Sequence, residues 1–455
     1  MKKNNTIGIF HYQLGSTDGV SLEVEKWKTV LERMGYQVIL CAGKLGNQDG
    51  ILLPALYHHQ EEIELLNQVI RGESQDLSPS EMAELIQNQA QKLETDLQKA
   101  IIENNINLLL VNNIWSVGLH LPAAIAMENV RRKLDLPTIA HHHDFYWERK
   151  LVIPKELAFL NDLVDVYLPP RDPKIKHVVI NSLAKNRLLE RKSITASVVT
   201  NVFDFEGSEW DVDVYNRDLR REIGLDQNDI LMMQGTRIIP RKGIELAIDL
   251  VKSLNEPHRR AKLERLGLFD GRKFTAKNKI ILVLAGYDRD DPTGEYLQKL
   301  KDKAEKLGVN LRHIDKFIGP EREQRESTKI YSLWDAYAIA DFVTYPSLWE
   351  GWGNQFLEAL KAKLPIVLFE YPVYIQDIKP KGFEVISLGS EILGRDEANL
   401  ASIPEDIIQR AADQCVNYLT NCPLREEMVE KNYQLGEQNY SFDRLQHHIS
   451  NLIMR

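Results

Sequence analysis

Short apolar runs alternate with amphipathic stretches along most of the chain, and this alternation restricts the fold more than any other feature. Residues 6–10 predict a buried strand, residues 20–34 a helix ended by Gly35, and residues 36–41 a second strand. A strand, a helix and another strand in this order indicate a parallel sheet with helices packed on its faces. Further strands are expected at residues 107–111, 137–140, 164–168 and 178–181.

The same alternation resumes after about residue 205, which indicates a second sheet. Strands are expected at residues 230–235, 280–286, 342–345, 366–369 and 384–386, and the last stretch, 440–455, has a helical pattern. At roughly 150 residues per domain, a chain of 455 residues suits two or three domains. We therefore predict an α/β protein with two doubly wound, Rossmann-like domains at residues 1–205 and 206–435, followed by a final helical segment at residues 436–455.

The composition excludes several classes of protein. Lys and Arg number 57 against 66 Asp and Glu, and the resulting charge of −9 argues against a nucleic-acid partner because an acidic chain repels a polyanion. No apolar run approaches the ~18 uncharged residues of a membrane span, so no integral membrane contact is expected. Three cysteines, and an N-terminal apolar run too short for a signal peptide, predict a cytoplasmic protein without a disulfide framework.

The first candidate site follows the predicted strand at 230–235. Arg237 and Lys242 stand at either end of a short loop that leads into a helix. In a parallel sheet, ligands bind beyond the carboxyl ends of the strands, and two fixed cations there suit a diphosphate leaving group. The alternative is a basic loop whose charges are solvated.

The second candidate site follows the predicted strand at 342–345. A glycine-containing turn holds Glu350, and Glu358 lies about one turn into the helix that follows. Backbone amides of such a turn favour an anion, while the two carboxylates can accept hydrogen bonds from sugar hydroxyls. The alternative makes Glu358 a surface residue of the helix and Glu350 a capping acid.

The third candidate site is the stretch 139–149, which also follows a strand. Successive side chains of an extended segment point apart, so His141, His142 and His143 cannot all bind one metal ion. Tyr146 and Trp147, together with the charged residues around them, suit stacking on a sugar ring or binding of an anionic acceptor, and packing of a lid is the alternative. Residues 288–291 form an acidic run that we interpret as a solvated loop.

A small-residue loop at 15–21 follows the first predicted strand. Its amides could approach a phosphate, with Gly19 at the entry of the helix. The loop lacks the Gly-x-Gly-x-x-Gly fingerprint, so a nicotinamide cofactor is not supported.

Taken together, these motifs resemble the family-4 retaining glycosyltransferases of the GT-B fold. Glu350, a Gly-x-Gly turn and Glu358 eight positions later match that family's Glu-x7-Glu signature, and Arg237 with Lys242 match its Arg…Lys pair. Residues 201–204 resemble its hinge. The resemblance, sharpest over residues 205–387, implies two Rossmann-like domains that face a cleft, with a final helix that crosses back to the first domain.

The resemblance also implies roles for individual residues. Arg237 and Lys242 would hold the diphosphate, Glu350 the donor hexose, and Glu358 the ribose. His143 would contact the donor sugar, with His141 or His142 as alternatives in case of a register slip. The remaining expected donor contacts are Gly351, Trp352, Gly353, Asn354 and Gly19, and the expected acceptor contacts are Asp144, Tyr146, Trp147 and Arg149.

The implied function is retaining transfer of a hexose, glucose or mannose, from a nucleotide-diphospho-sugar to a small soluble acceptor such as a sugar, a polyol or a glycerate derivative. No cofactor and no catalytic metal are expected. A sugar phosphorylase or a nucleotide-sugar epimerase of the same fold is the alternative, and a non-catalytic glycan- or nucleotide-binding protein is the second. The sequence leaves the nucleotide base, the acceptor and the oligomeric state open.

Overall fold

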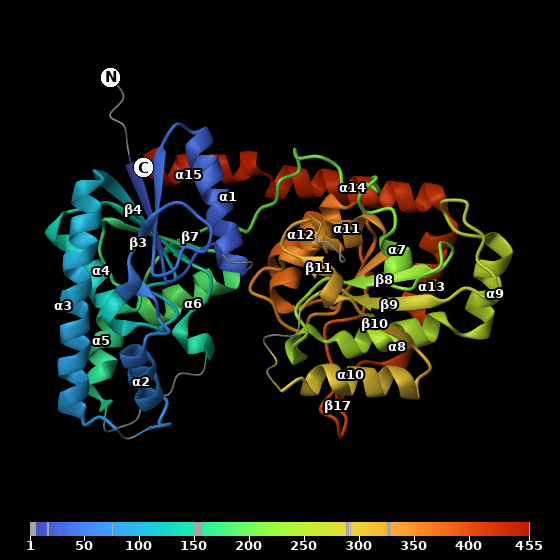
Figure 1. Cartoon of the computed structure of the whole chain (residues 1–455), viewed down its shortest axis with the longest axis horizontal. Coiled ribbons are helices and arrows are strands. Elements are labelled where there is room, and N and C mark those ends of the chain that lie inside the picture. Colours follow the sequence, from blue (N-terminus) through green and yellow to red (C-terminus); the bar gives the residue numbers. More distant parts are fainter. Residues whose placement is uncertain are drawn as a thin grey trace. The chain divides into compact units, whose positions relative to one another are not determined.

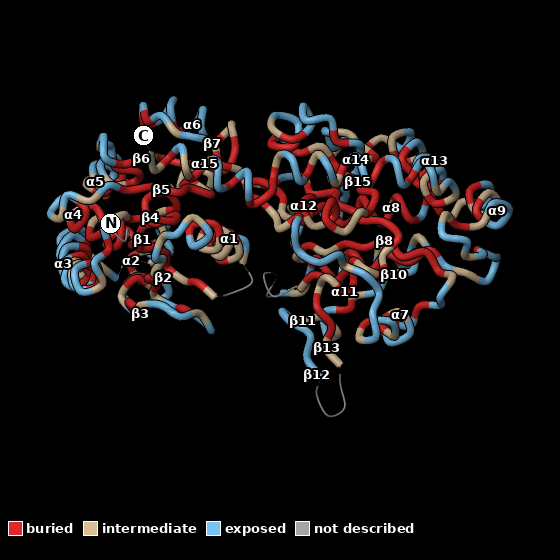
Figure 2. The backbone as a smooth tube through the Cα atoms, turned by 90° about the horizontal axis from the view of Figure 1, so that it is seen from above, coloured by how far each residue is buried: buried red, intermediate tan, exposed pale blue. Residues whose placement is uncertain are grey.

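The computed structural model describes residues 6–15, 18–74, 76–149, 157–287, 291, 293–324 and 329–454. The chain forms two compact units (Figure 1). The first comprises Met1–Val202 with Phe442–Arg455, and the second comprises Phe203–Ser441. Each unit contains a parallel sheet with helices on both faces, and the strands are the most deeply buried parts (Figure 2).

Within the described residues, the first unit contains a seven-stranded sheet in the order β3-β2-β1-β4-β5-β6-β7. All of its pairings are parallel, and the order reverses between β1 and β4, which is where a doubly wound sheet opens for ligands. The strands are β1 (Thr6–His11), β2 (Gln37–Ala42), β3 (Ile51–Leu52), β4 (Ile106–Asn112), β5 (Thr138–His142), β6 (Ile175–Val179) and β7 (Ala196–Val198).

Two sets of helices cover the faces of this sheet. On one face, Ile9 of β1 packs with Trp27 of α1 and Ile449 of α15, so the last helix of the chain completes the core of the first unit. On the other face, α2 to α5 bury a larger cluster that includes Leu109 and Met127. The helices are α1 (Gly19–Arg33), α2 (Glu61–Ile70), α3 (Pro79–Glu103), α4 (Leu121–Lys133), α5 (Phe159–Tyr167), α6 (Ser182–Lys192) and α15 (Phe442–Met454).

The second unit repeats this plan. Its described residues form a six-stranded parallel sheet in the order β10-β9-β8-β14-β15-β16, which reverses between β8 and β14. Phe342 of β14 lies opposite Met232 of β8. The strands are β8 (Ile230–Gln234), β9 (Ile280–Leu284), β10 (Asn310–His313), β14 (Phe342–Tyr345), β15 (Ile366–Leu368) and β16 (Ile386–Ser387).

Helices α8 and α13 and their neighbours enclose the core of the second unit, in which Leu246 and Leu250 are fully buried. The helices are α7 (Leu219–Glu222), α8 (Ile244–Leu254), α9 (Pro257–Leu266), α10 (Glu295–Lys306), α11 (Leu333–Ala338), α12 (Asn354–Lys361), α13 (Glu405–Thr420) and α14 (Cys422–Tyr440). Short pairings add β11 (Ile318–Gly319), β12 (Glu323–Gln324), β13 (Lys329–Ser332), β17 (Gly394–Arg395) and β18 (Ala401–Ser402).

The boundaries between the units differ from those predicted at 205/206 and 435/436. Residues 203–205 pack in the second unit, where the Tyr433 hydroxyl donates to the Phe205 carbonyl at 2.7 Å. Helix α14 continues through residue 436 to Tyr440, whose carbonyl accepts from the Phe203 amide. The divisions therefore fall between Val202 and Phe203 and between Ser441 and Phe442.

The strand predicted at residues 164–168 is wrong. This apolar run is the end of helix α5, because Leu160 and Val164 face the core four residues apart. A short apolar run fits both the helical period of 3.6 residues and the strand period of two, and only its packing decides between helix and strand. Within the described residues, no helix is both long and apolar enough to span a membrane.

We expect Leu445→Ala to lower the free energy of unfolding by about 2–5 kcal/mol, because Leu445 of α15 is fully buried against the sheet of the first unit. Urea unfolding followed by circular dichroism measures this loss. Gln446→Ala, on the exposed side of the same helix, is the control and should leave the transition unchanged. Equal effects of the two variants would contradict the packing of α15.

Candidate active site

Two loops meet at the carboxyl edge of the second unit's sheet. One follows β8 (residues 235–243) and the other follows β14 (residues 346–353), and these strands are neighbours at the point where the strand order reverses. The Leu348 amide donates to the Arg241 carbonyl at 2.9 Å. Gly243 has a φ of +58°, and a Cβ there would lie 2.4 Å from the Pro346 carbonyl oxygen. The close contact of the two loops therefore depends on a glycine at 243.

A buried carboxylate joins the two loops. Glu350 is only 6% exposed, and its Oε1 accepts a hydrogen bond from the Lys242 ammonium, which is itself 7% exposed. Its Oε2 lies 2.9 Å from Nη1 of Arg241. Burial acts to raise the pKa of the Glu350 carboxyl, but Lys242 and Arg241 outweigh burial and lower that pKa to about 2. Glu350 is therefore an ionised acceptor held between two cations.

The turn after Glu350 is tightly packed. Gly353 has a φ of +120°, and a Cβ there would lie 2.4 Å from the Tyr371 hydroxyl and 2.6 Å from the Tyr345 hydroxyl. The Tyr371 hydroxyl donates to the Trp352 carbonyl at 2.7 Å. The Trp352 side chain is buried against Tyr440, which makes its indole part of the core. Helix α12 begins at Asn354, so the backbone of Gly351–Asn354 lies at the start of a helix, as predicted.

Glu358 lies on α12, one turn beyond this start. Its Oε2 accepts a hydrogen bond from the Tyr337 hydroxyl at 2.7 Å. Burial and the neighbouring carboxylate raise the pKa of Tyr337 well above its usual value, so this phenol remains a donor. Arg237 is partly buried in the loop after β8. The structure thus brings Lys242 and Glu350 into contact. Arg237 lies in the same loop as Lys242, and Glu358 lies on the helix that follows the loop of Glu350.

The sequence assigned no role to Arg241 or Tyr337. Arg241 lies within the loop already singled out, but the spacing of the motif points to Arg237. Tyr337 lies in the short helix α11, where the local sequence gives no signal of a functional role. Both residues act on the motif carboxylates, and only the folded chain places them there.

The first unit presents the histidine segment at the carboxyl end of β5. The His143 amide donates to Oδ1 of Asn113 at 2.8 Å, and the Asn113 amide donates back to the His141 carbonyl at 3.0 Å. The His141 and His143 rings lie 4.4 Å apart, whereas Nε2 of His142 lies 3.0 Å from Nδ1 of His177. His143 is the most exposed of the three, at 8%.

Burial is the main cause that lowers the pKa of His143 to about 4, so its imidazole is neutral near neutral pH. The His141 and His143 rings lie together while His142 contacts His177, as expected for the alternating side chains of an extended segment. Within the described residues, no group of three or more His, Cys, Asp or Glu side chains is arranged to hold a metal ion. Residues 288–290 of the predicted acidic loop lie outside the described residues.

The aromatic side chains after His143 pack against other residues of the protein. Trp147 stacks on Phe145 at 4.3 Å, and the Arg191 guanidinium lies 5.5 Å from the same indole. Tyr146 is half-buried, and its amide donates to the Ser116 carbonyl at 2.7 Å. Asp144 is partly exposed, and the Arg149 side chain lies outside the described residues.

Gly19 is the first residue of α1, as expected for its loop. The Asp18 carboxylate caps this helix, accepting from the amides of Val20 at 2.9 Å and Ser21 at 3.1 Å. These two amides therefore donate to a side chain of the protein itself, Asp18. An Asp directly before the helix is a capping signal that could have been identified from the sequence.

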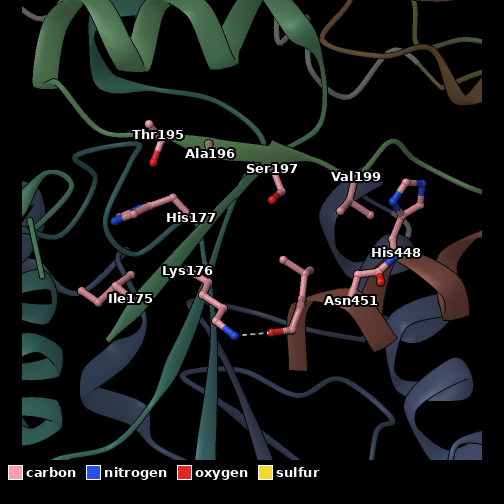
Figure 3. A pocket seen from close by; sticks show the side chains of 10 residues that line it. Ile175, Lys176, His177, Thr195, Ala196, Ser197, Val199, His448 and Asn451 are labelled. Atoms are coloured by element: carbon pink, nitrogen blue, oxygen red, sulfur yellow. Dashed lines mark hydrogen bonds between the residues drawn. The ribbon is translucent and has the colours of Figure 1, made fainter. Parts of the chain in front are cut away.

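A pocket of about 410 Å³ in the first unit lies between β6, β7 and α15 (Figure 3). Within it, the Lys176 ammonium donates to the Leu452 carbonyl at 2.5 Å. The pocket lies along the start of β6, at Ile175–His177, and its lining includes none of the predicted site residues. We therefore do not include it in the candidate active site.

Comparisons with known proteins identify the family of this chain. Residues 216–382 match the family described as glycosyl transferases group 1. The chain is 36% identical over 449 residues to mannosylglucosylglycerate synthase of Thermotoga maritima, covering 98% of this chain and 99% of that protein. It is 38% identical over 386 residues to mannosylglucosylglycerate synthase of Petrotoga mobilis, covering 85% and 87% of the two chains.

Solved structures establish the fold. A glycosyltransferase from Rickettsia africae aligns with a TM-score of 0.61 at 14% identity, covering 99% of this chain and 97% of that one. Sucrose-phosphate synthase from Thermosynechococcus elongatus aligns with a TM-score of 0.60 at 13% identity, covering 99% and 98%. The α/β fold predicted from the sequence, with the two Rossmann-like units of GT-B, is confirmed.

We expect the contribution of Glu350 to the free energy of unfolding to decrease at acidic pH. Its pKa is about 2 in the folded chain against an ordinary 4.5, so the contribution is complete above the ordinary value and is lost as pH falls toward 2. The difference in unfolding free energy between the wild type and Glu350→Gln should narrow by about 1 kcal/mol from about pH 5.5 to about pH 3.5. Urea unfolding at both pH values measures it, and Glu391→Gln, at an exposed position, is the control.

Proposed function

Because this chain belongs to the glycosyl transferases group 1 family, we propose that it transfers a mannosyl group from a nucleotide-diphospho-mannose to glucosylglycerate. The chain is a hexosyltransferase. The choice of acceptor rests on its likeness, over nearly its whole length, to an enzyme named mannosylglucosylglycerate synthase. The observation that carries the chemistry is the ionised Glu350 carboxylate in contact with Lys242 at the strand ends of the second unit.

The second unit would bind the donor. Arg237 and Lys242 carry positive charge on the loop after β8, and a diphosphate gains charge as it departs. Glu350 accepts hydrogen bonds from hydroxyls of the hexose, and amides of Gly351–Asn354 approach the sugar or phosphate. Glu358, held by Tyr337, accepts from the ribose hydroxyls.

The transfer would retain the anomeric configuration. The bond between the anomeric carbon and the phosphate oxygen breaks while the acceptor hydroxyl forms a new bond on the same face. The proton of that hydroxyl passes to the departing diphosphate, so no carboxylate nucleophile is required. His143, neutral because burial lowers its pKa, would contact a hydroxyl of the donor hexose.

The first unit would bind the acceptor through the segment after His143. Asp144 and the Tyr146 hydroxyl suit sugar hydroxyls, and the cation of Arg149 suits the carboxylate of glycerate. Trp147 would support this segment through its stack on Phe145. The protein would act in the cytoplasm on soluble substrates, without a cofactor.

The direct test incubates the purified protein with guanosine-, uridine- and adenosine-diphospho-mannose and glucosylglycerate. We expect release of nucleoside diphosphate that requires the acceptor, and NMR of the product should show the anomeric configuration of the donor. Glycerate and glucose are the control acceptors. Product formed without an acceptor, release of sugar phosphate on addition of phosphate, or inversion would contradict the proposal and favour a phosphorylase, an epimerase or an inverting enzyme.

We expect protein cations, rather than a metal ion, to stabilise the leaving diphosphate. Lys242→Met should lower kcat by about 10²–10³-fold, whereas excess EDTA should leave the rate of the wild type unchanged. Lys252→Met, at an exposed position on α8, is the matched control and should have no effect. Loss of activity in EDTA that is restored by Mg²⁺ or Mn²⁺ would contradict this prediction.

A further inference from the structure

The two carboxylate oxygens of Glu350 have different cationic partners, Lys242 and Arg241. Only one of these two cations is expected to bind the diphosphate as well. Lys242 contacts Oε1 and is also the cation expected to meet the diphosphate. Arg241 lies 2.9 Å from Oε2, and the same Nη1 donates to the Trp349 carbonyl at 3.1 Å. Arg241 is thus attached to the turn that carries Glu350.

We propose that Arg241 is a positioning residue that holds Glu350 toward the donor hexose when Lys242 turns to the diphosphate. This inference rests on the proposed function of Glu350 as a ligand of the hexose. A donor sugar nucleotide adds negative charge beside Lys242, which weakens the attraction between Lys242 and Glu350 by competition. A buried carboxylate that loses one cation needs another, because an unpaired buried charge is costly.

The surroundings of Arg241 support this role. Its side chain is about one-third exposed, its guanidinium lies 5.8 Å from the partly exposed Trp349 ring, and its carbonyl accepts from the Leu348 amide. Backbone and side chain therefore both attach it to the turn of residues 348–350. Arginine suits this position because its planar group donates in several directions from one fixed site.

If Arg241 positions Glu350, its substitution should affect the nucleotide sugar much more than the nucleoside diphosphate. Under the proposed function, a nucleoside diphosphate alone would contact Arg237, Lys242 and Glu358 but would offer no hexose to Glu350. Arg241→Gln should therefore change the Kd of the nucleoside diphosphate by less than about threefold while lowering kcat/KM for the nucleotide sugar by about 10- to 100-fold, the range for one charge-assisted hydrogen bond.

The experiment measures both quantities, by calorimetry and by initial rates, in wild type, Arg241→Gln, Arg241→Lys, Glu350→Gln and the double variant. Arg241→Lys keeps the charge and should recover at least about threefold in kcat/KM over Arg241→Gln. If Arg241 acts through Glu350, Arg241→Gln should add little in the Glu350→Gln background, because the two effects are coupled. Arg410→Gln removes an exposed ion pair to Asp406 and is the matched control.

The inference is overturned if Arg241→Gln weakens nucleoside diphosphate binding as much as it lowers kcat/KM, if the two substitutions are additive, or if Arg241→Lys recovers nothing. Failure of the proposed function gives a different result, because the wild type itself would then turn over no nucleotide sugar. The Arg241 inference is tested only when the wild type and Arg410→Gln are active, and the Arg241 variants then decide it.

Discussion

The buried ionised carboxylate of Glu350 is the constraint on which the second unit's site depends. A carboxylate that is 6% exposed is stable only beside compensating cations, and Lys242 and Arg241 supply them from the neighbouring loop. For those cations to reach it, β8 and β14 must be adjacent in the sheet and their loops must be in contact. Gly243 permits that contact through its positive φ, and Gly353 permits the turn after Glu350.

The first unit also buries polar side chains at the end of a strand, but there the buried groups are neutral. Three histidines at the end of β5 are buried, and burial lowers the pKa of each, so they remain uncharged. Asn113 fixes the backbone beside His143 through two hydrogen bonds, one given and one received. The groups at the two strand ends thus differ in charge: Lys242 and Arg241 are cations, whereas the three histidines are neutral.

Much of the fold was predictable because it depends on local periodicity. Strands at 230–235, 280–286 and 366–369 were placed within two residues, since a buried parallel strand is a continuous apolar run. The run at 164–168 ends a helix instead of forming the predicted strand, because its apolar pattern also fits a helix whose face packs on the core. The unit boundaries differ from those predicted because α14 extends to Tyr440 within the second unit and because Phe205 packs against it.

The sequence by itself determined the α/β alternation and the motif spacings that place Lys242 and Glu350 in loops after strands and Glu358 in the helix that follows one of these loops. These features follow from neighbours along the chain and from periods of two or 3.6 residues. Only the tertiary structure decided that Arg241 shares Glu350 with Lys242, that Tyr337 holds Glu358, and that His142 pairs with His177 while His143 keeps the most exposure. The physical reason is that such pairs join residues far apart in the chain, and strand order and register, rather than local pattern, bring their side chains together.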